Sequence, residues 1–452
     1  MAKPMGTWAR PTVRGITVAP EPPATFRIRG RRLICFPSSR RYHPQMPGST
    51  PRPPAAGVLG CAMLLFLGWT GLVIPSLIRS VETDFGQTDA GLGVFYLIWS
   101  ITYAIGTFGG GLVTERLGRR TVLVLAATSV TIGLVVLGMT RSWEVFMVAA
   151  LPGGLGAGVI DGGSNGLFLD LFRTGRGRAL NILHLFFGIG ALTAPIAIGF
   201  LVDQGVAWQG ILIGTGAGGA VLALAILLVP MPGGRHERAP RDDGAGGDGA
   251  GRPSRFGPGI AVPLVVLGAA MAAYVASEVG VSSWLVRFLD EAPLSTATTA
   301  LSLYWGGLAL GRFLSSIVAD RFDHRRFVTV SSALMGIAIL AAVLVPSLPV
   351  SIALFALAGV ASGPIFPMVV ALGGEQYPDR AAAISGVIAG CGVIGSIVYP
   401  PLMGFMSVTV GLTIAMLGNA VLAFAAAGAL LLLGRKTRPA ENGRQAPPVG
   451  NA

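Results

Sequence analysis

The residues LPGGLGAGVIDGGSNGLFLDLFRTGRGRALNILHLFFGIGALTAPIAIGFLV (151–202) reveal the architecture of this chain. They contain two long apolar runs joined by an arginine-rich turn, which predicts two membrane-spanning helices. Asp161 and Asn165 interrupt the first run, and Asn181 and His184 stand early in the second. A charge inside a membrane helix costs roughly 2.5–3.5 kcal/mol on insertion scales, so it usually lines a pathway or meets a partner. We therefore expect Asp161 to be functional.

The composition of the chain is that of a polytopic membrane protein. Of its 452 residues, 52% are hydrophobic and 12% are charged, whereas soluble domains carry about 25% charged residues. The net charge of +12 does not predict nucleic-acid binding, because the basic residues lie mainly in a tail and in alternate loops. The three cysteines have no close spacing, so neither a disulfide framework nor a metal site is predicted.

Twelve apolar segments predict an all-α protein with two six-helix bundles. The predicted spans are 55–78, 89–113, 120–140, 144–171, 179–202 and 207–230, then 258–287, 297–319, 327–346, 349–374, 381–407 and 411–434. The bundles cover 55–230 and 258–434. A Gly-, Asp- and Arg-rich cytoplasmic linker (231–257) joins them, and a short tail follows (435–452). Residues 1–54 are either a disordered basic and Pro-rich tail or include a mis-annotated start, with translation beginning at Met46.

The distribution of arginine predicts the orientation of the chain. Even-numbered connections hold most of the loop arginines, and odd-numbered connections hold only Arg79, Arg141 and Arg287. Because basic loops stay on the cytoplasmic side, both termini and the linker are predicted to be cytoplasmic. Lysine is nearly absent from the chain, whereas arginine, alanine and glycine are abundant, a bias typical of GC-rich bacterial genomes. We therefore expect the protein in the inner (plasma) membrane of a bacterium.

The two halves repeat at an offset of about 205 residues. Glu115-Arg116 corresponds to Asp320-Arg321, Gly154 to Gly359 and Pro195 to Pro400. Two such halves predict a substrate site near mid-membrane, between them.

With GGGLVTERLGRR (109–120), its weaker echo SIVADRFDHRR (316–326) and the 6+6 layout, the chain resembles the major facilitator superfamily. The resemblance implies the major facilitator fold. It also implies that the motif's acid and arginines lock the cytoplasmic helix ends in one state. The positions implied for this lock are Gly111, Glu115, Arg116, Gly118, Arg119, Arg120, Asp320 and Arg321.

Asp161 and Asn165 lie one helical turn apart and share a face. Counted back from Arg173 at about 1.5 Å per residue, Asp161 lies roughly 18 Å deep, near the midplane. We expect it to bind and release a proton, with Asn165 bonding a ligand or the carboxylate; a structural network between helices is the alternative. Asn181 and His184 share a face of the next helix, where His184 is either a functional group or a solvated helix-end histidine.

Further candidates lie in the second half. Glu278 is flanked by Tyr274 and Trp284, a pattern suited to sugar-like ligands, although Trp284 equally fits an interfacial anchor. Arg312 is an intramembrane charge that pairs with a helix-end acid, holds a gate or extends its guanidinium to the interface. The other cavity-lining candidates are Trp69, Trp305, Phe366 and Tyr399.

Within the superfamily, three motifs resemble the fucose/glucose–proton symporter group: GLGAGVIDGGSN (154–165), LNILHLFFGIGALTAP (180–195) and YVASEVGVSSW (274–284). The resemblance implies that Asp161 couples proton and sugar movement and that Asn165 is the accompanying amide. The fucose-transporting members also carry an acid in the first helix, and residues 61–78 contain none.

We therefore predict a secondary active transporter, not an enzyme. The expected activity is proton-coupled symport of a sugar or similar small polar solute by alternating access. Proton-driven efflux of amphipathic molecules is the alternative. We expect a monomer in the lipid bilayer, with no cofactor besides the coupling proton.

Overall fold

The computed structural model describes residues 55–172, 176–231, 258–377 and 380–433. The predicted tails and almost all of the linker lie outside these residues, as does the side chain of Asp320. Apart from its connecting turns, the described chain is α-helical, with a 3-10 turn at Ala319–Arg321. The helices of the first half are α1 (Ala55–Phe85), α2 (Asp89–Leu117), α3 (Arg119–Met139), α4 (Trp143–Leu171), α5 (Arg176–Asp203) and α6 (Trp208–Leu228).

The second half contains seven helices because one membrane span is broken. They are α7 (Pro258–Phe288), α8 (Leu294–Val318), α9 (His324–Leu344), α10 (Leu348–Ser362), α11 (Ile365–Gln376), α12 (Ala381–Val410) and α13 (Leu412–Leu432). Together α10 and α11 form one span, so the twelve spans predicted from the sequence are confirmed. The predicted span over 349–374 is thus present, and the sequence analysis did not predict its interruption at Gly363-Pro364. Pro364 lacks an N–H, and its ring disfavours a continuous helix through the preceding turn.

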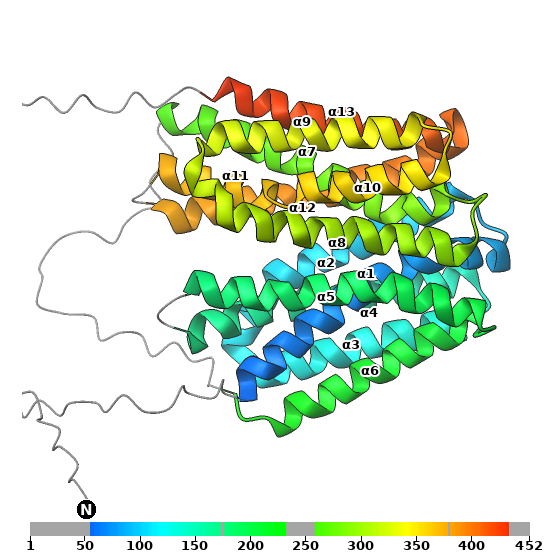
Figure 1. The fold of residues 1–452 in the computed structure, drawn as a ribbon. Coiled ribbons are helices and arrows are strands. Elements are labelled where there is room, and N and C mark those ends of the chain that lie inside the picture. Colours follow the sequence, from blue (N-terminus) through cyan, green and yellow to red (C-terminus); the bar gives the residue numbers. More distant parts are fainter. Residues whose placement is uncertain (1–54, 173–175, 232–257, 378–379, 434–452) are drawn as a thin grey trace, which may run out of the picture. The chain divides into compact units, whose positions relative to one another are not determined.

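Helix boundaries confirm the internal repeat. Helices α2, α3 and α4 begin at residues 89, 119 and 143, and α8, α9 and α10 begin 205 residues later, at 294, 324 and 348. In Figure 1 the first half, blue to green, and the second half, green to red, form two bundles of nearly parallel and antiparallel helices.

The two halves meet through equivalent helices. Helix α2 packs on α12 and its counterpart α8 packs on α5, while α1 contacts α7. Helices α3, α6, α9 and α13 pack within their own halves. The central surface between the halves is therefore lined by α1, α2, α5, α7, α8 and α12.

Helix α1 extends seven residues beyond its predicted end at residue 78. The prediction ended at the first charged residue, Arg79. An apolar run marks only the part of a helix that lies in the membrane, and the backbone hydrogen bonds of the helix can continue beyond it. The added turns carry Arg79 and Glu82 to the junction between the halves.

Candidate functional site

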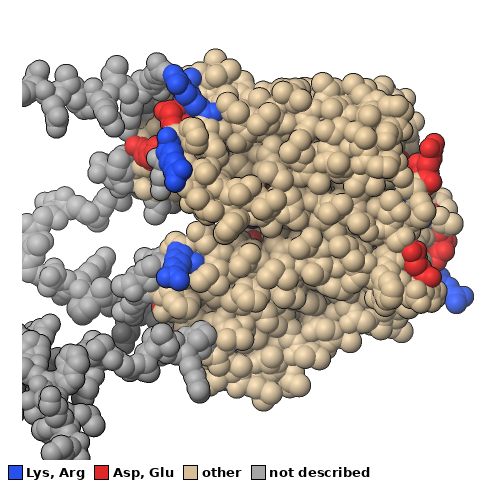
Figure 2. All heavy atoms as spheres, in the orientation of Figure 1, with Lys and Arg blue, Asp and Glu red and all other residues tan. Residues whose placement is uncertain are grey.

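The two ends of the bundle differ in charge. The end that holds the α2–α3 and α8–α9 connections carries Arg116, Arg120, Arg321 and Arg326, and we call it the basic end. Figure 2 shows basic side chains gathered there, and several acidic side chains at the opposite end.

At the opposite end, polar contacts join the two halves. The Arg79 guanidinium of α1 donates to the backbone carbonyls of Val286 at 2.8 Å and Ala292 at 2.7 Å, and also to Leu289. Arg287 of α7 reaches Glu82 at 2.8 Å.

Asp89, at the start of α2, completes this junction. Arg287 also pairs with Asp89, at 3.0 Å, and the Ser407 hydroxyl of α12 donates to the same carboxylate. These groups border an open vestibule of about 1150 Å³ at the opposite end. The vestibule is lined by the junction itself and does not reach Asp161.

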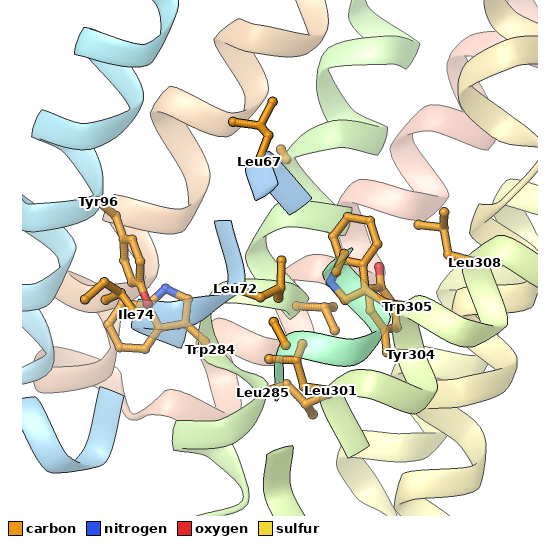
Figure 3. Close-up of a cluster of buried hydrophobic side chains, with 14 of the residues drawn as sticks. Leu67, Leu72, Ile74, Tyr96, Trp284, Leu285, Leu301, Tyr304, Trp305 and Leu308 are labelled. Carbon is orange, nitrogen blue, oxygen red and sulfur yellow. The ribbon is translucent and has the colours of Figure 1, made fainter. Parts of the chain in front are cut away.

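Below the charged junction, aromatic and aliphatic side chains fill the space between the halves. Tyr96 of α2 meets Trp284 of α7 edge to face at a centroid distance of 5.7 Å, and its hydroxyl donates to the Ser283 carbonyl at 3.2 Å. Figure 3 shows this pair together with Leu72 and Leu285 in the buried cluster. The halves are thus closely packed toward the opposite end.

Toward the basic end the halves separate. Figure 2 shows a notch between them at that end. Asn181 and His184, on the first turns of α5, are exposed, and Asp161 and Asn165 are half-buried. The predicted polar residues therefore lie where the interface changes from closed to open.

Four polar side chains form a continuous hydrogen-bonded network across three helices. The Tyr103 hydroxyl of α2 donates to Asp161 Oδ2 at 2.8 Å. Asn165 Nδ2 donates to Asp161 Oδ1 at 3.0 Å, and Asn165 Oδ1 lies 3.1 Å from His184 Nε2. The sequence predicted three of these four residues, and the structure brings them together.

The direction of the bonds follows from the chemistry of each group. Because the Asn165 amide nitrogen donates to Asp161, the amide oxygen is the acceptor for His184, so Nε2 of the imidazole carries the hydrogen. Both Asp161 oxygens accept hydrogen bonds. The arrangement therefore suits a deprotonated carboxylate, with one donor from Tyr103 and one from Asn165 directed at it.

The sequence reasoning missed Tyr103. A tyrosine in a membrane helix is common, and only the crossing of α2 and α4 reveals its partner. That crossing is close, because a Cβ atom on Gly158 would collide with the carbonyl oxygen of Tyr103. The small residue lets the two backbones approach until the hydroxyl reaches the acid.

Glu278 of α7 is buried and lies in a separate environment. The Tyr274 hydroxyl, one turn earlier on the same helix, donates to its carboxylate. Arg312 of α8 is close enough to interact electrostatically with both Glu278 and His184. In the described part of the chain, however, Arg312 forms no ion pair within 4 Å, and its buried Nε has no hydrogen-bond partner.

Several other candidates have partners that explain their positions by packing. Trp69 donates to Thr215 of α6 at 3.2 Å. Trp284 is fully buried and donates to the Pro400 carbonyl at 2.8 Å. Tyr399 donates to the Ala415 carbonyl of α13 at 2.7 Å. In each case a hydrogen bond to a neighbouring helix fixes the orientation of the ring.

Trp305 and Phe366 lie differently. Trp305 of α8 meets Phe187 of α5 across the two halves at a centroid distance of 5.8 Å, and its indole nitrogen is buried without a partner. Phe366 is half-buried in the first turn of α11.

The loop residues of the first half that were predicted to act as a lock have their partners within that half. Gly118 has a φ of 81° between α2 and α3, a conformation that favours glycine. Arg119 pairs with Asp170 at 2.5 Å, and Arg120 donates to the Ile226 carbonyl at 3.3 Å. The remaining described lock positions, which have exposed side chains or backbone, are Gly111, Glu115, Arg116 and Arg321.

Twelve spans in two repeated halves, with a polar network among α2, α4 and α5 of the first half, fit the framework of a membrane carrier. The chain matches the sequence profile of the Major Facilitator Superfamily over residues 58–292 and 259–450. It belongs to this superfamily. The predicted fold and the assignment as a membrane transporter rather than an enzyme are thereby confirmed.

Related superfamily proteins have diverse activities. The chain is 24% identical to the uncharacterised transporter YfkL of Bacillus subtilis, over 79% of this chain and 92% of that protein. It is 23% identical to the gentisate transporter of Corynebacterium glutamicum, over 85% and 88% of the two chains. The quinolone resistance protein NorA of Staphylococcus aureus is 27% identical over 32% of this chain and 34% of its own.

Solved structures share the fold. A bacterial homologue of the lysosomal transporter Spinster, in an inward-facing conformation, superposes with a TM-score of 0.69 at 18% identity, covering 85% of this chain and 97% of that one. A D-xylose–proton symporter superposes with a TM-score of 0.65 at 16% identity, covering 83% and 96%.

Proposed function

We propose that this superfamily transporter is a proton-coupled symporter that imports a small polar solute, such as a sugar or a sugar-like molecule, across the plasma membrane. The single observation that carries the proposal is the network around Asp161, in which Tyr103 and Asn165 both donate to one intramembrane carboxylate. Proton carriers need such a group at a site that opens to one side at a time.

The proposed cycle uses the junction at the opposite end as its outer closure. With the basic end in the cytoplasm, the described conformation opens inward. Protonation of Asp161 from outside favours solute binding, because it removes a negative charge from the cavity. After inward opening, the proton leaves Asp161 for the water of the notch, and the donors of Tyr103 and Asn165 stabilise the carboxylate that remains. His184 holds the amide oxygen of Asn165, so that the amide nitrogen stays directed at Asp161. The protein works as a monomer.

The test is substrate-induced proton movement in proteoliposomes that contain the full chain. Hexoses, pentoses, deoxysugars and small organic acids are screened, with Asp161→Asn beside the wild type. We expect one solute class to bring protons in and the variant to lose gradient-driven accumulation while still exchanging labelled solute. The matched control is Asp203→Asn, an exposed acid at the end of α5. Accumulation that survives in Asp161→Asn would contradict the mechanism.

A second candidate function is proton-driven efflux, which is supported by the partial similarity to the quinolone resistance protein NorA. Export would use the same acid with solute and proton moving in opposite directions. The two functions separate in cells, where efflux raises resistance to amphipathic compounds and symport supports growth on a scarce solute. A resistance change that disappears in Asp161→Asn would favour export.

A further inference from the structure

We propose that Arg312 and Trp305 form an anion-binding subsite, and that the transported solute carries a carboxylate or an equivalent acidic group. This inference rests on the proposed transport function and narrows its solute from polar molecules in general to small organic anions.

The first observation is a pair of buried donors without acceptors. Arg312 Nε and Trp305 Nε1 are both inaccessible and unpartnered. A guanidinium has five N–H donors and no acceptor, and an indole nitrogen only donates. Leaving such groups buried and unpaired is costly unless a ligand pairs with them. The missing partner must therefore be an acceptor.

The second observation is that both donors lie on one face of α8, and that this face meets the first half. They are seven residues apart, or two turns, which is about 10.5 Å along the helix. Trp305 contacts Phe187 of α5, and Arg312 interacts electrostatically with His184, three residues earlier on α5. Figure 3 shows Trp305 beside Tyr304 in the buried cluster. The face of α8 that carries Trp305 and Arg312 thus leads from the buried cluster toward His184 and the notch.

The third observation concerns the carboxylates that would be expected to neutralise Arg312. Glu278 accepts a hydrogen bond from Tyr274 and remains more than an ion-pair distance from the guanidinium. Asp161 lies across the interface and is occupied by Tyr103 and Asn165. Within the described residues, Glu278 thus acts on Arg312 only at a distance, and Nε of the guanidinium has no direct acceptor.

The fourth observation is the break between α10 and α11. A Cβ atom on Gly363 would collide with the backbone nitrogen of Arg312, so the break lies directly against this turn of α8. Helix α11 begins two residues later, at Ile365. The C-terminal end of α10 and the N-terminal end of α11 therefore both lie beside this turn of α8. A broken membrane helix beside a buried cation is a suitable place for an anionic group.

The division of charge also fits coupling. The acid that takes the proton lies in the first half and the cation that holds the solute lies in the second. An organic anion between them is repelled by a deprotonated Asp161 and accepted when Asp161 is protonated. Solute and proton then enter together for an electrostatic reason.

The experiment measures thermal stabilisation of the purified full chain by matched acid and neutral probes, without any proton gradient. The probe pairs are D-glucuronate with D-glucose and benzoate with benzyl alcohol. In the wild type we expect the acid of at least one pair to stabilise the protein and its neutral partner to stabilise it much less. We expect Arg312→Gln to weaken the apparent affinity for the acid about 10- to 100-fold, the effect of losing a charged hydrogen-bond donor.

Three further variants separate binding from folding. Arg312→Lys keeps the charge but not the planar fork, so we expect an intermediate affinity for the acid. Trp305→Phe keeps an aromatic ring against Phe187 and loses the N–H, with a loss of about fivefold. Arg141→Gln, at an exposed position of the α3–α4 connection, should bind as the wild type does.

Equal stabilisation by the neutral probes, an acid affinity that survives in Arg312→Gln, or no acid-specific stabilisation in any pair would overturn the anion subsite. Because binding is measured without a gradient, acid binding combined with failed proton coupling would reject the symport mechanism and leave the subsite standing. Proton-coupled uptake of neutral sugars alone would reject the anion subsite and leave the symport mechanism standing.

Discussion

In the first half Arg119 pairs with Asp170 at 2.5 Å, and 205 residues later His324 pairs with Glu375 at the same distance. Arg120 caps the Ile226 carbonyl of α6, and its counterpart Arg325 caps the last carbonyls of α13. These contacts tie helix ends together at the basic end of each half.

The centres of the two halves differ in chemistry. The position equivalent to Asp161 is Phe366, and the position equivalent to Arg312 is Thr107. Asp161 thus has no charged counterpart in the second half, and Arg312 has none in the first. The contacts between helix ends repeat because the same helices pack against each other in both bundles. The central charges do not repeat, because the acid Asp161 lies in one half and the cation Arg312 in the other.

The largest expected effect tests the shared packing. Gly154→Val and Gly359→Val, at equivalent positions of the repeat, each place a side chain against a backbone carbonyl, that of Trp99 or Tyr304, which cannot move aside. Overpacking costs about 1–3 kcal/mol or more, so we expect the yield of monodisperse protein in size-exclusion chromatography to fall about tenfold in both variants.

The control for this pair is Gly428→Val, where an added Cβ meets no neighbouring atom. It should purify as the wild type does. If only one of the two crossing glycines proved sensitive, the two halves would not share the packing rule.

The next effect concerns the junction between the halves. Arg287→Ala removes the ion pairs to Glu82, Asp89 and Asp290 and leaves the neighbouring acidic side chains of Glu82 and Asp89 without their cation. Since breaking a buried pair is strongly destabilising, we expect the closure to open more often. A cysteine at Ser302, buried between α5 and α8, should then react with a thiol reagent about tenfold faster.

This labelling experiment uses a chain in which Cys35, Cys61 and Cys391 are replaced. Arg141→Ala is the matched control, because it removes an exposed arginine from the same end of the bundle. Unchanged labelling in Arg287→Ala would show that apolar packing alone holds the halves together there.

A smaller effect tests the chemistry that the halves do not share. Tyr103→Phe removes one donor to Asp161 without changing the ring. A hydrogen bond to a charged group contributes about 1.5–3 kcal/mol, so we expect gradient-driven accumulation in proteoliposomes to fall at least about tenfold. Tyr399→Phe removes a hydroxyl bonded only to the backbone of α13 and should lower thermal stability while transport continues. Equal transport losses in both variants would argue against a special role for Tyr103.

The smallest effect belongs to the repeated ion pairs at the basic end. The Asp170 side chain is 42% exposed, and exposed pairs contribute about 0–1 kcal/mol. We expect Asp170→Asn to change the free energy of unfolding by less than about 1 kcal/mol, measured by denaturant titration in detergent. A loss of several kcal/mol would mean that this pair is an essential clamp.

Much of the architecture was predictable because the bilayer imposes a strong rule. Every backbone polar group in the membrane must be paired within its own helix, so long apolar runs become helices regardless of context. The twelve spans and the 205-residue repeat follow from this rule. This rule did not predict the break at Gly363-Pro364 or the seven-residue extension of α1. Hydropathy indicates which residues lie in the membrane, but not where a helix bends or ends.

The sequence alone identified Asp161, Asn165 and His184 as candidate functional residues, since uncompensated polar groups are rare in membrane helices. Only the tertiary structure decided their partners. Tyr103 reaches Asp161 because α2 and α4 cross closely at Gly158, and Arg312 stays unpaired because Glu278 is bonded elsewhere. Helical periodicity places residues on a face, but the partner across that face depends on how two helices cross, and crossing is a property of the folded bundle.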